Sequence, residues 1–173
     1  MKVCLSVGHS PSAQGACNLR NGISEYQYNS MLTVLVREEL EKLGIDVVLV
    51  SRTTLNELPN LVNQTKADVA IELHCNAFDE NTSGSEVLHF TTSSEGALLA
   101  AHINDEVCDV LGLRNRGIKP SDRELLLKKT TMPCVIVEPF FIDKDSDLII
   151  GIKKMGSLAK AIAVGVYRYS LTN

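Results

Sequence analysis

The feature that most constrains the fold of this chain is the alternation of short apolar runs with longer segments of helical periodicity. Strand-length apolar runs occur in the first half of the chain at residues 3–7, 46–50 and 69–73. Apolar side chains keep helical spacing in the segments between them, at about 24–43 and more weakly at 56–66. Strands and helices that alternate in this order form a mainly parallel sheet whose faces are covered by helices.

The second half of the chain continues this pattern with fewer clear signals. Strands are predicted at 85–92 and 134–138, with a short strand near 125–127, and helices at 94–111 and 152–169. Residues 116–120 are predicted to form a loop or an edge segment, and residues 143–147 an acidic loop. We therefore expect an α/β fold. It is a single domain over residues 1–173, with a mainly parallel, mixed and twisted sheet of about six strands and helices on both faces.

The composition argues against several classes of partner and location. The net charge is −4 and no run of lysine or arginine occurs, so no binding to nucleic acid is expected. No apolar stretch approaches the ~18 residues of a membrane span, so membrane insertion is not expected either. The five cysteines form no C-x-x-C pair, which is typical of folding in a reducing compartment. Residues 1–8 lack the regions of a secretion signal, so we expect synthesis in the cytoplasm without a signal peptide.

Polar residues able to bind a metal or transfer protons follow the ends of several predicted elements. They are His9 after the first strand, Glu25 in the first turn of the first helix, His74 after the third strand and Glu138 at the end of the last clear strand. Strand ends and the helix starts that follow them lie on one edge of a parallel sheet, so we expect these side chains to share one rim. Two imidazoles and one carboxylate are the protein ligands of many catalytic zinc sites, and a further carboxylate can move the proton of an attacking water.

Each of these residues also has a structural interpretation. His9 could be a turn residue that bonds to the backbone, and His74 a strand-end histidine paired with Asn76 or a neighbour. Glu25 would be favoured by the helix dipole with no metal present. For Glu138 the structural interpretation is weaker, because a carboxylate that ends a buried apolar run is costly unless it is paired or functional.

Other polar residues near these positions are weaker candidates. Glu72 precedes His74 by two residues on a strand and therefore points to the same side, where it could support a ligand or form a structural pair. His89 and His102 are expected to be packed or solvated rather than ligands. Cys75 is not expected to be a nucleophile, because a side chain next to His74 points the other way.

Eight short motifs follow one another in order along almost the whole chain. They are Val7-Gly8-His9, Gly15-Ala16-Cys17, residues 21–29 (NGISEYQYN), Ser51-Arg52-Thr53, residues 67–77 (ADVAIELHCNA), Gly84-Ser85-Glu86-Val87, Arg116-Gly117-Ile118-Lys119 and residues 133–141 (PCVIVEPFF). Through these motifs the sequence resembles the zinc-dependent N-acetylmuramoyl-L-alanine amidases, and most closely the catalytic domains of phage endolysins and bacterial autolysins.

The resemblance implies a site and a reaction. His9, Glu25 and His74 would bind Zn²⁺, and Glu138 would be the catalytic acid and base. The substrate and expected partner would be peptidoglycan, cleaved at the amide that joins the N-acetylmuramoyl lactyl group to L-alanine. Residues 1–173 would then be an amidase catalytic domain. We expect it to be a monomer that acts on the cell wall after release, in phage lysis.

Several alternatives stay open on the sequence alone. They are a bacterial autolysin, a spore-related amidase, a zinc peptidase that cuts the stem peptide, and a wall-binding relative that has lost catalysis. Ser10-Pro11 and Pro139 stand where glycine is common in the family, and the helical segment at 56–66 lacks the usual arginine-rich pattern. None of these departures falls on a proposed ligand, so they bear on which stem peptide is accepted rather than on the reaction.

Overall fold

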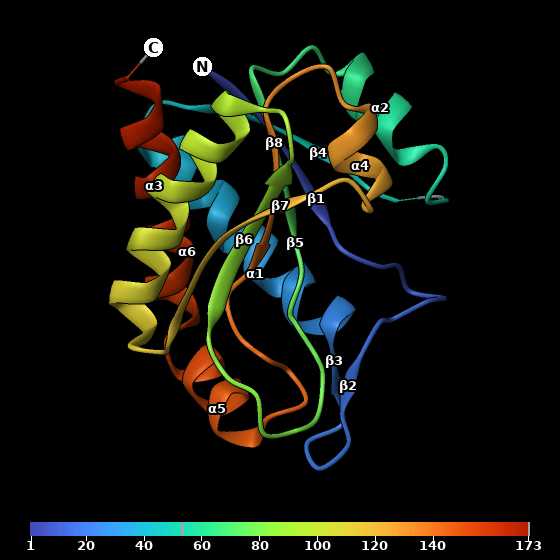
Figure 1. The fold of residues 1–173 in the computed structure, drawn as a ribbon, viewed down its shortest axis with the longest axis vertical. Coiled ribbons are helices and arrows are strands. Elements are labelled where there is room, and N and C mark those ends of the chain that lie inside the picture. The colour runs from blue at the N-terminus through green and yellow to red at the C-terminus, as the bar shows by residue number, and fades with distance from the viewer. Residues whose placement is uncertain (53, 173) are drawn as a thin grey trace.

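A six-stranded mixed sheet forms the centre of the protein, as the computed structural model of residues 1–52 and 54–172 shows (Figure 1). Its strands lie in the order β4 (Asp46–Val50), β1 (Lys2–Val7), β5 (Val69–Leu73), β8 (Cys134–Glu138), β6 (Ser85–Phe90) and β7 (Asn115–Ser121). All neighbouring pairs are parallel except β6 and β8, which are antiparallel. The expected α/β domain with a mainly parallel, mixed sheet is confirmed.

Helices cover both faces of this sheet, also as expected (Figure 1). One face carries the long helices α1 (Glu25–Lys42), α3 (Ser94–Leu111) and α6 (Met155–Ser170), and α5 (Asp145–Lys153) leads into α6. The other face carries the short helices α2 (Leu58–Gln64) and α4 (Leu125–Lys129). A two-stranded hairpin of β2 (Cys17–Asn18) and β3 (Ile23–Ser24) precedes α1.

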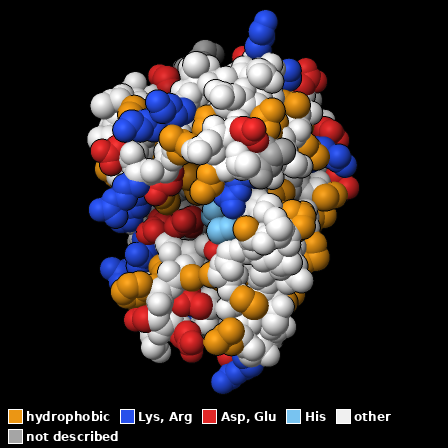
Figure 2. Space-filling model, turned by 90° about the vertical axis from the view of Figure 1, so that its right-hand side faces the viewer, with side chains coloured by type: hydrophobic (Ala, Val, Ile, Leu, Met, Phe, Trp, Pro, Cys, Tyr) orange, Lys and Arg blue, Asp and Glu red, His pale blue; other side chains and the backbone are white. Residues whose placement is uncertain are grey.

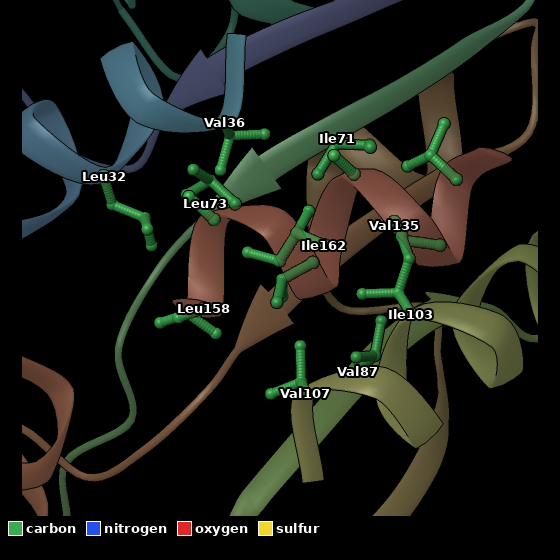
Figure 3. Packing of buried hydrophobic residues seen from close by; sticks show 14 of the residues in the cluster. Leu32, Val36, Ile71, Leu73, Val87, Ile103, Val107, Val135, Leu158 and Ile162 are labelled. Atoms are coloured by element: carbon green, nitrogen blue, oxygen red, sulfur yellow. The ribbon is translucent and has the colours of Figure 1, made fainter. Parts of the chain in front are cut away.

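Alternation along the strands divides the apolar residues into two clusters. In β5, Ile71 and Leu73 pack into the larger cluster beneath the long helices, whereas Ala70 packs into the smaller one beneath α2 and α4. Figure 3 shows side chains of α1, α3 and α6 pointing toward those of β5 and β8 in the larger cluster. Because β1, β5 and β8 are buried on both faces, they appear as largely apolar runs in the sequence.

Two predicted segments differ from the structure. The short strand predicted near 125–127 is wrong, since these residues begin helix α4 and bury Leu126 and Leu127 against α2. A run of three apolar residues is too short to distinguish the two periodicities. The expected acidic loop ends early, because Asp145 and Asp147 lie in the first turn of α5, where the helix dipole favours carboxylates.

Two other segments are more ordered than the sequence indicated. Residues 116–120 belong to β7, which is an edge strand, and Pro120 is tolerated there because an edge strand has one unpaired side. The segment before α1 forms the β2–β3 hairpin, which no pattern in the sequence indicates. In the part of the chain that the structure describes, no helix is long and apolar enough to cross a membrane.

Candidate metal centre and catalytic site

Three of the predicted site residues converge at the carboxyl edge of the sheet. His9 follows β1, His74 follows β5, and Glu25 is the first residue of α1. The Oε2 atom of Glu25 lies 3.2 Å from Nε2 of His9 and 3.2 Å from Nδ1 of His74. One ligand atom from each residue lies within 4.8 Å of the other two, so the group could hold a single metal ion.

Two glycines make room for the two imidazole rings. A Cβ atom on Gly8 would lie 2.5 Å from Nε2 of His74, and one on Gly15 would lie 2.6 Å from Cδ2 of His9. Gly15 also has a φ of +76°, a conformation that glycine adopts at little cost. The Gly8 N–H donates to the carbonyl of Leu73 at 2.8 Å, which ties the end of β1 to the end of β5. Because Gly8 and Gly15 have no side chains, the two imidazole rings have space to lie close together.

The Glu25 carboxylate is fixed by the chain around it. The capping box of Ser24 and Gln27 begins α1 at this residue. The Oε1 atom accepts a hydrogen bond of 3.0 Å from the Ala16 N–H, and Oε2 accepts one of 3.2 Å from the Cys75 N–H. Burial opposes ionisation, but the hydrogen bonds with His74 and His9 outweigh it and lower the pKa of Glu25 to about 2. The carboxylate is thus held ionised between two imidazoles.

The His74 ring lies between two carboxylates. Its Nδ1 faces Glu25, and its Nε2 lies 3.3 Å from Oε2 of Glu72. Burial disfavours the charged ring, but the hydrogen bonds with Glu25 and Glu72 outweigh it and raise the pKa of His74 to about 10. The prediction that Glu72 and His74 share one side of the strand is confirmed. A metal that binds Nδ1 must displace a proton from this ring, while Glu72 remains a partner for Nε2.

Glu138 ends β8 and belongs to a second group of polar residues. Asn76 Nδ2 donates hydrogen bonds of 2.7 Å to Oε2 of Glu138 and to Oε1 of Glu86. Arg116 Nε donates to Oε2 of Glu86 at 2.7 Å. Burial, followed by the charge of Glu86, raises the pKa of Glu138 to about 7. A carboxyl group with such a pKa can both accept and donate a proton near neutral pH.

Sequence reasoning did not single out Glu86 or Arg116, and it named Asn76 only as a possible structural partner of His74, although all three lie within the motifs that carry the family resemblance. Glu86 reaches Glu138 because the two are register partners across β6 and β8, which a sequence does not reveal. His89 and His102 lie outside the group of potential metal ligands among the described residues. The Cys75 side chain is buried in the larger apolar cluster.

A cavity of about 470 Å³ opens beside these residues. Its walls include Glu72, His74 and Glu138, together with residues of α2 and α4. Figure 2 shows histidine side chains exposed in the middle of one face, with acidic side chains on one side and a basic side chain on the other. The candidate metal ligand His74 and the titratable carboxyl group of Glu138 therefore face the same space.

The donor set fits a divalent metal such as zinc. Two imidazole nitrogens and one carboxylate oxygen are ligands that zinc accepts in catalytic sites. The His9 and His74 rings lie edge to face with centroids 5.0 Å apart, which leaves both nitrogens pointing at the same carboxylate. The histidine–carboxylate contact at Nε2 of His74 is the support that such a ligand commonly has.

Comparison with known proteins shows the family to which this chain belongs. A family model described as N-acetylmuramoyl-L-alanine amidase matches residues 3–168. The chain belongs to this amidase family. The N-acetylmuramoyl-L-alanine amidase LytC of Bacillus subtilis (strain 168) is 31% identical over 152 residues, which is 84% of this chain and 30% of that protein. The chain thus spans less than a third of the length of this curated relative.

Solved structures of the amidase family share the whole fold. The catalytic domain of the CD27L endolysin targeting Clostridia Difficile has a TM-score of 0.86 and 32% identity, with 97% of each chain covered. The N-acetylmuramoyl-L-alanine amidase from Clostridium difficile 630 has a TM-score of 0.92 and 25% identity, covering 99% of this chain and 97% of that chain. All four predicted site residues lie within the segment that the family model matches.

Proposed function

We propose that residues 1–173 form an amidase catalytic domain. It hydrolyses the amide between the N-acetylmuramoyl lactyl group and L-alanine in peptidoglycan, with zinc held by His9, Glu25 and His74. The observation that carries this proposal is the shared contact of the Glu25 carboxylate with both imidazoles, beside a cavity that also contains Glu138. Membership of the family supports the substrate and the bond that is cut.

Each residue of the site has a separate role in the proposed reaction. When bound, zinc supplies Lewis acidity, which polarises a carbonyl and makes a water molecule more acidic. Glu138 accepts a proton from the attacking water and returns it to the departing amine nitrogen. Asn76 holds Glu138 in place by a hydrogen bond, while burial and the charge of Glu86 raise its pKa to about 7, where it can do both. Glu72 orients the His74 ring through Nε2.

We propose further that the domain acts in phage lysis of the cell wall. Supporting this role is the likeness over almost its full length to an endolysin catalytic domain. The family relatives also include LytC and the sporulation-specific N-acetylmuramoyl-L-alanine amidase of Bacillus subtilis (strain 168). An autolysin or a spore-related amidase would use the same site on the same bond, so the test of the chemistry comes first.

The reaction is tested on purified peptidoglycan with the zinc-loaded protein. Mass spectrometry of the soluble products should show stem peptides with free L-alanine amino termini, and the glycan should stay intact. Glu138→Ala should keep the fold and the zinc but lose turnover. Glu38→Gln, an exposed carboxylate on α1, is the matched control and should turn over normally. Cleavage between stem-peptide residues would instead indicate a zinc peptidase, and full activity of Glu138→Ala would overturn the role of Glu138.

Metal binding is tested separately by elemental analysis. His74→Ala should lower the zinc content below one ion per chain, whereas His102→Ala, which lies outside the group of potential ligands, should not. Stoichiometric zinc in His74→Ala would refute its assignment as a ligand.

A further inference from the structure

The cavity beside His74 and Glu138 extends well beyond the residues that the proposed reaction needs. Its volume of about 470 Å³ exceeds the space of a single amide group, and it reaches residues of α2, α4 and the loop after β4. Glu138 must protonate the amine that leaves, so the part of the substrate attached to that nitrogen lies beside Glu138. In peptidoglycan this part is the stem peptide, and the cavity is therefore on the peptide side of the scissile bond.

Part of the cavity lining is apolar and suits a small aliphatic side chain. This part consists of Leu55, Leu58, Leu88, Leu126 and Ile136. No aromatic side chain of the described residues lines it, so it offers no stacking platform for a sugar ring. The larger cavity of about 760 Å³, near Asn18 and Asp143, is lined mostly by polar residues and contains none of the four site residues.

Two arginines, Arg52 and Arg123, complete the lining. Within residues 1–52 and 54–172, the guanidinium groups of Arg52 and Arg123 form no ion pair, whereas Arg20, Arg116 and Arg168 each have a carboxylate partner. A guanidinium group binds a carboxylate through two parallel hydrogen bonds, which makes arginine well suited to recognising one. Together with the aliphatic residues of the lining, these cations match a peptide that carries a free carboxylate.

We propose that this cavity is the stem-peptide subsite and that Arg52 and Arg123 bind a carboxylate of that peptide, an inference that rests on the proposed amidase function. Arg52 lies in the loop between β4 and α2, and Arg123 lies just before α4. Both are thus on the sheet face that carries the short helices, outside the group that could hold the metal. They select the substrate and take no part in the proton transfers.

The carboxylate could come from the second or the third residue of the stem peptide. Two pairs of soluble muramoyl tripeptides separate these sources. In the first pair the second residue carries either its free carboxylate or the carboxamide. In the second pair the side chain of the third residue carries or lacks a carboxylate. Steady-state kinetics of peptide release are measured for each, with the zinc-loaded protein.

The wild-type protein should cleave the carboxylate member of one pair with a KM about tenfold lower than that of its partner, as expected for a charge-assisted hydrogen bond. In Arg52→Gln and Arg123→Gln the difference in KM between the two members of that pair should become smaller, while kcat should change little. Arg114→Gln, an exposed arginine that does not line the cavity, is the matched control and should keep the preference. Zinc content and thermal unfolding of each variant should match the wild type.

Equal KM values within both pairs for the wild-type protein would overturn the proposal, as would an unchanged preference in both arginine variants. Absence of peptide release from all four substrates by the wild-type protein is a different result. It would overturn the amidase function itself, and the subsite with it.

Discussion

Glu86 and Glu138 are register partners across the antiparallel pair of β6 and β8, and their carboxyl groups accept hydrogen bonds from the same nitrogen, Nδ2 of Asn76. Arg116 binds the far oxygen of Glu86 and stacks over the ring of Phe141, with its guanidinium carbon 5.0 Å from the ring centroid. Glu86 is thereby fixed in position beside Glu138. This arrangement places a titratable carboxyl group next to the candidate metal centre.

The rate should fall as the pH drops through about 7. Glu138 can accept a proton only when it is ionised, and its pKa is raised to about 7 by burial and by Glu86. Glu86→Gln removes the neighbouring charge, so the acid limb of the profile of kcat/KM should move to lower pH, by roughly one unit. An acid limb that stays in place in Glu86→Gln would show that Glu86 does not set this pKa. Glu41→Gln, an exposed carboxylate on α1, is the control.

Glu138→Gln should stabilise the fold at neutral and alkaline pH. An acid whose pKa is raised on folding weakens the native state once it ionises. The free energy of unfolding therefore begins to fall above pH 4.5, and the loss is complete above about pH 7. The variant should match the wild type near pH 4 and exceed its free energy of unfolding at pH 8 by about 1–3 kcal/mol. Urea unfolding of the metal-free proteins at both pH values measures this difference. A variant less stable than the wild type at pH 8 would contradict it.

The sequence predicted the central strands β1, β5 and β8 well, because strands buried on both faces appear as largely apolar runs. It predicted α4 as a strand, because the run from Leu125 to Leu127 is too short to show a period. The hairpin of β2 and β3 was missed because its strands have two residues each and leave no pattern.

The candidate site was more predictable than its surroundings. His9, His74 and Glu138 end apolar runs, and this position can be read from the sequence. Glu25 was ambiguous, since a carboxylate in a first helical turn looks the same with or without a metal. Its contacts with both imidazoles depend on how α1 docks on the sheet. The link from Glu86 to Glu138 depends on strand register, which no local pattern carries.

Glu72→Gln should weaken zinc binding without removing a direct ligand. The Glu72 carboxylate faces Nε2 of His74 and favours the ring orientation that points Nδ1 at Glu25. Loss of such a partner typically costs about 10- to 100-fold in metal affinity. Competition with a zinc chelator measures the change, and Glu38→Gln should show none. Unchanged affinity in Glu72→Gln would mean that Glu72 is a structural pair only.

Gly15→Ala should disturb the metal centre, whereas Gly22→Ala should not. Both residues have positive φ, +76° and +66°, so both substitutions carry the same kind of backbone strain, about 1–2 kcal/mol. The two positions differ in their surroundings. A Cβ on Gly15 would lie 2.6 Å from the ring of His9, while nothing lies within 4 Å of one on Gly22.

The comparison therefore isolates the contact with His9 from the strain. Gly15→Ala should displace the ring of His9 from Glu25 and reduce zinc affinity, and Gly22→Ala should lose stability but bind zinc like the wild type. Zinc affinity by chelator competition and the free energy of unfolding by urea are measured for both. Equal zinc affinities in the two variants would show that the ring of His9 does not need the space that Gly15 leaves, and would weaken its assignment as a metal ligand.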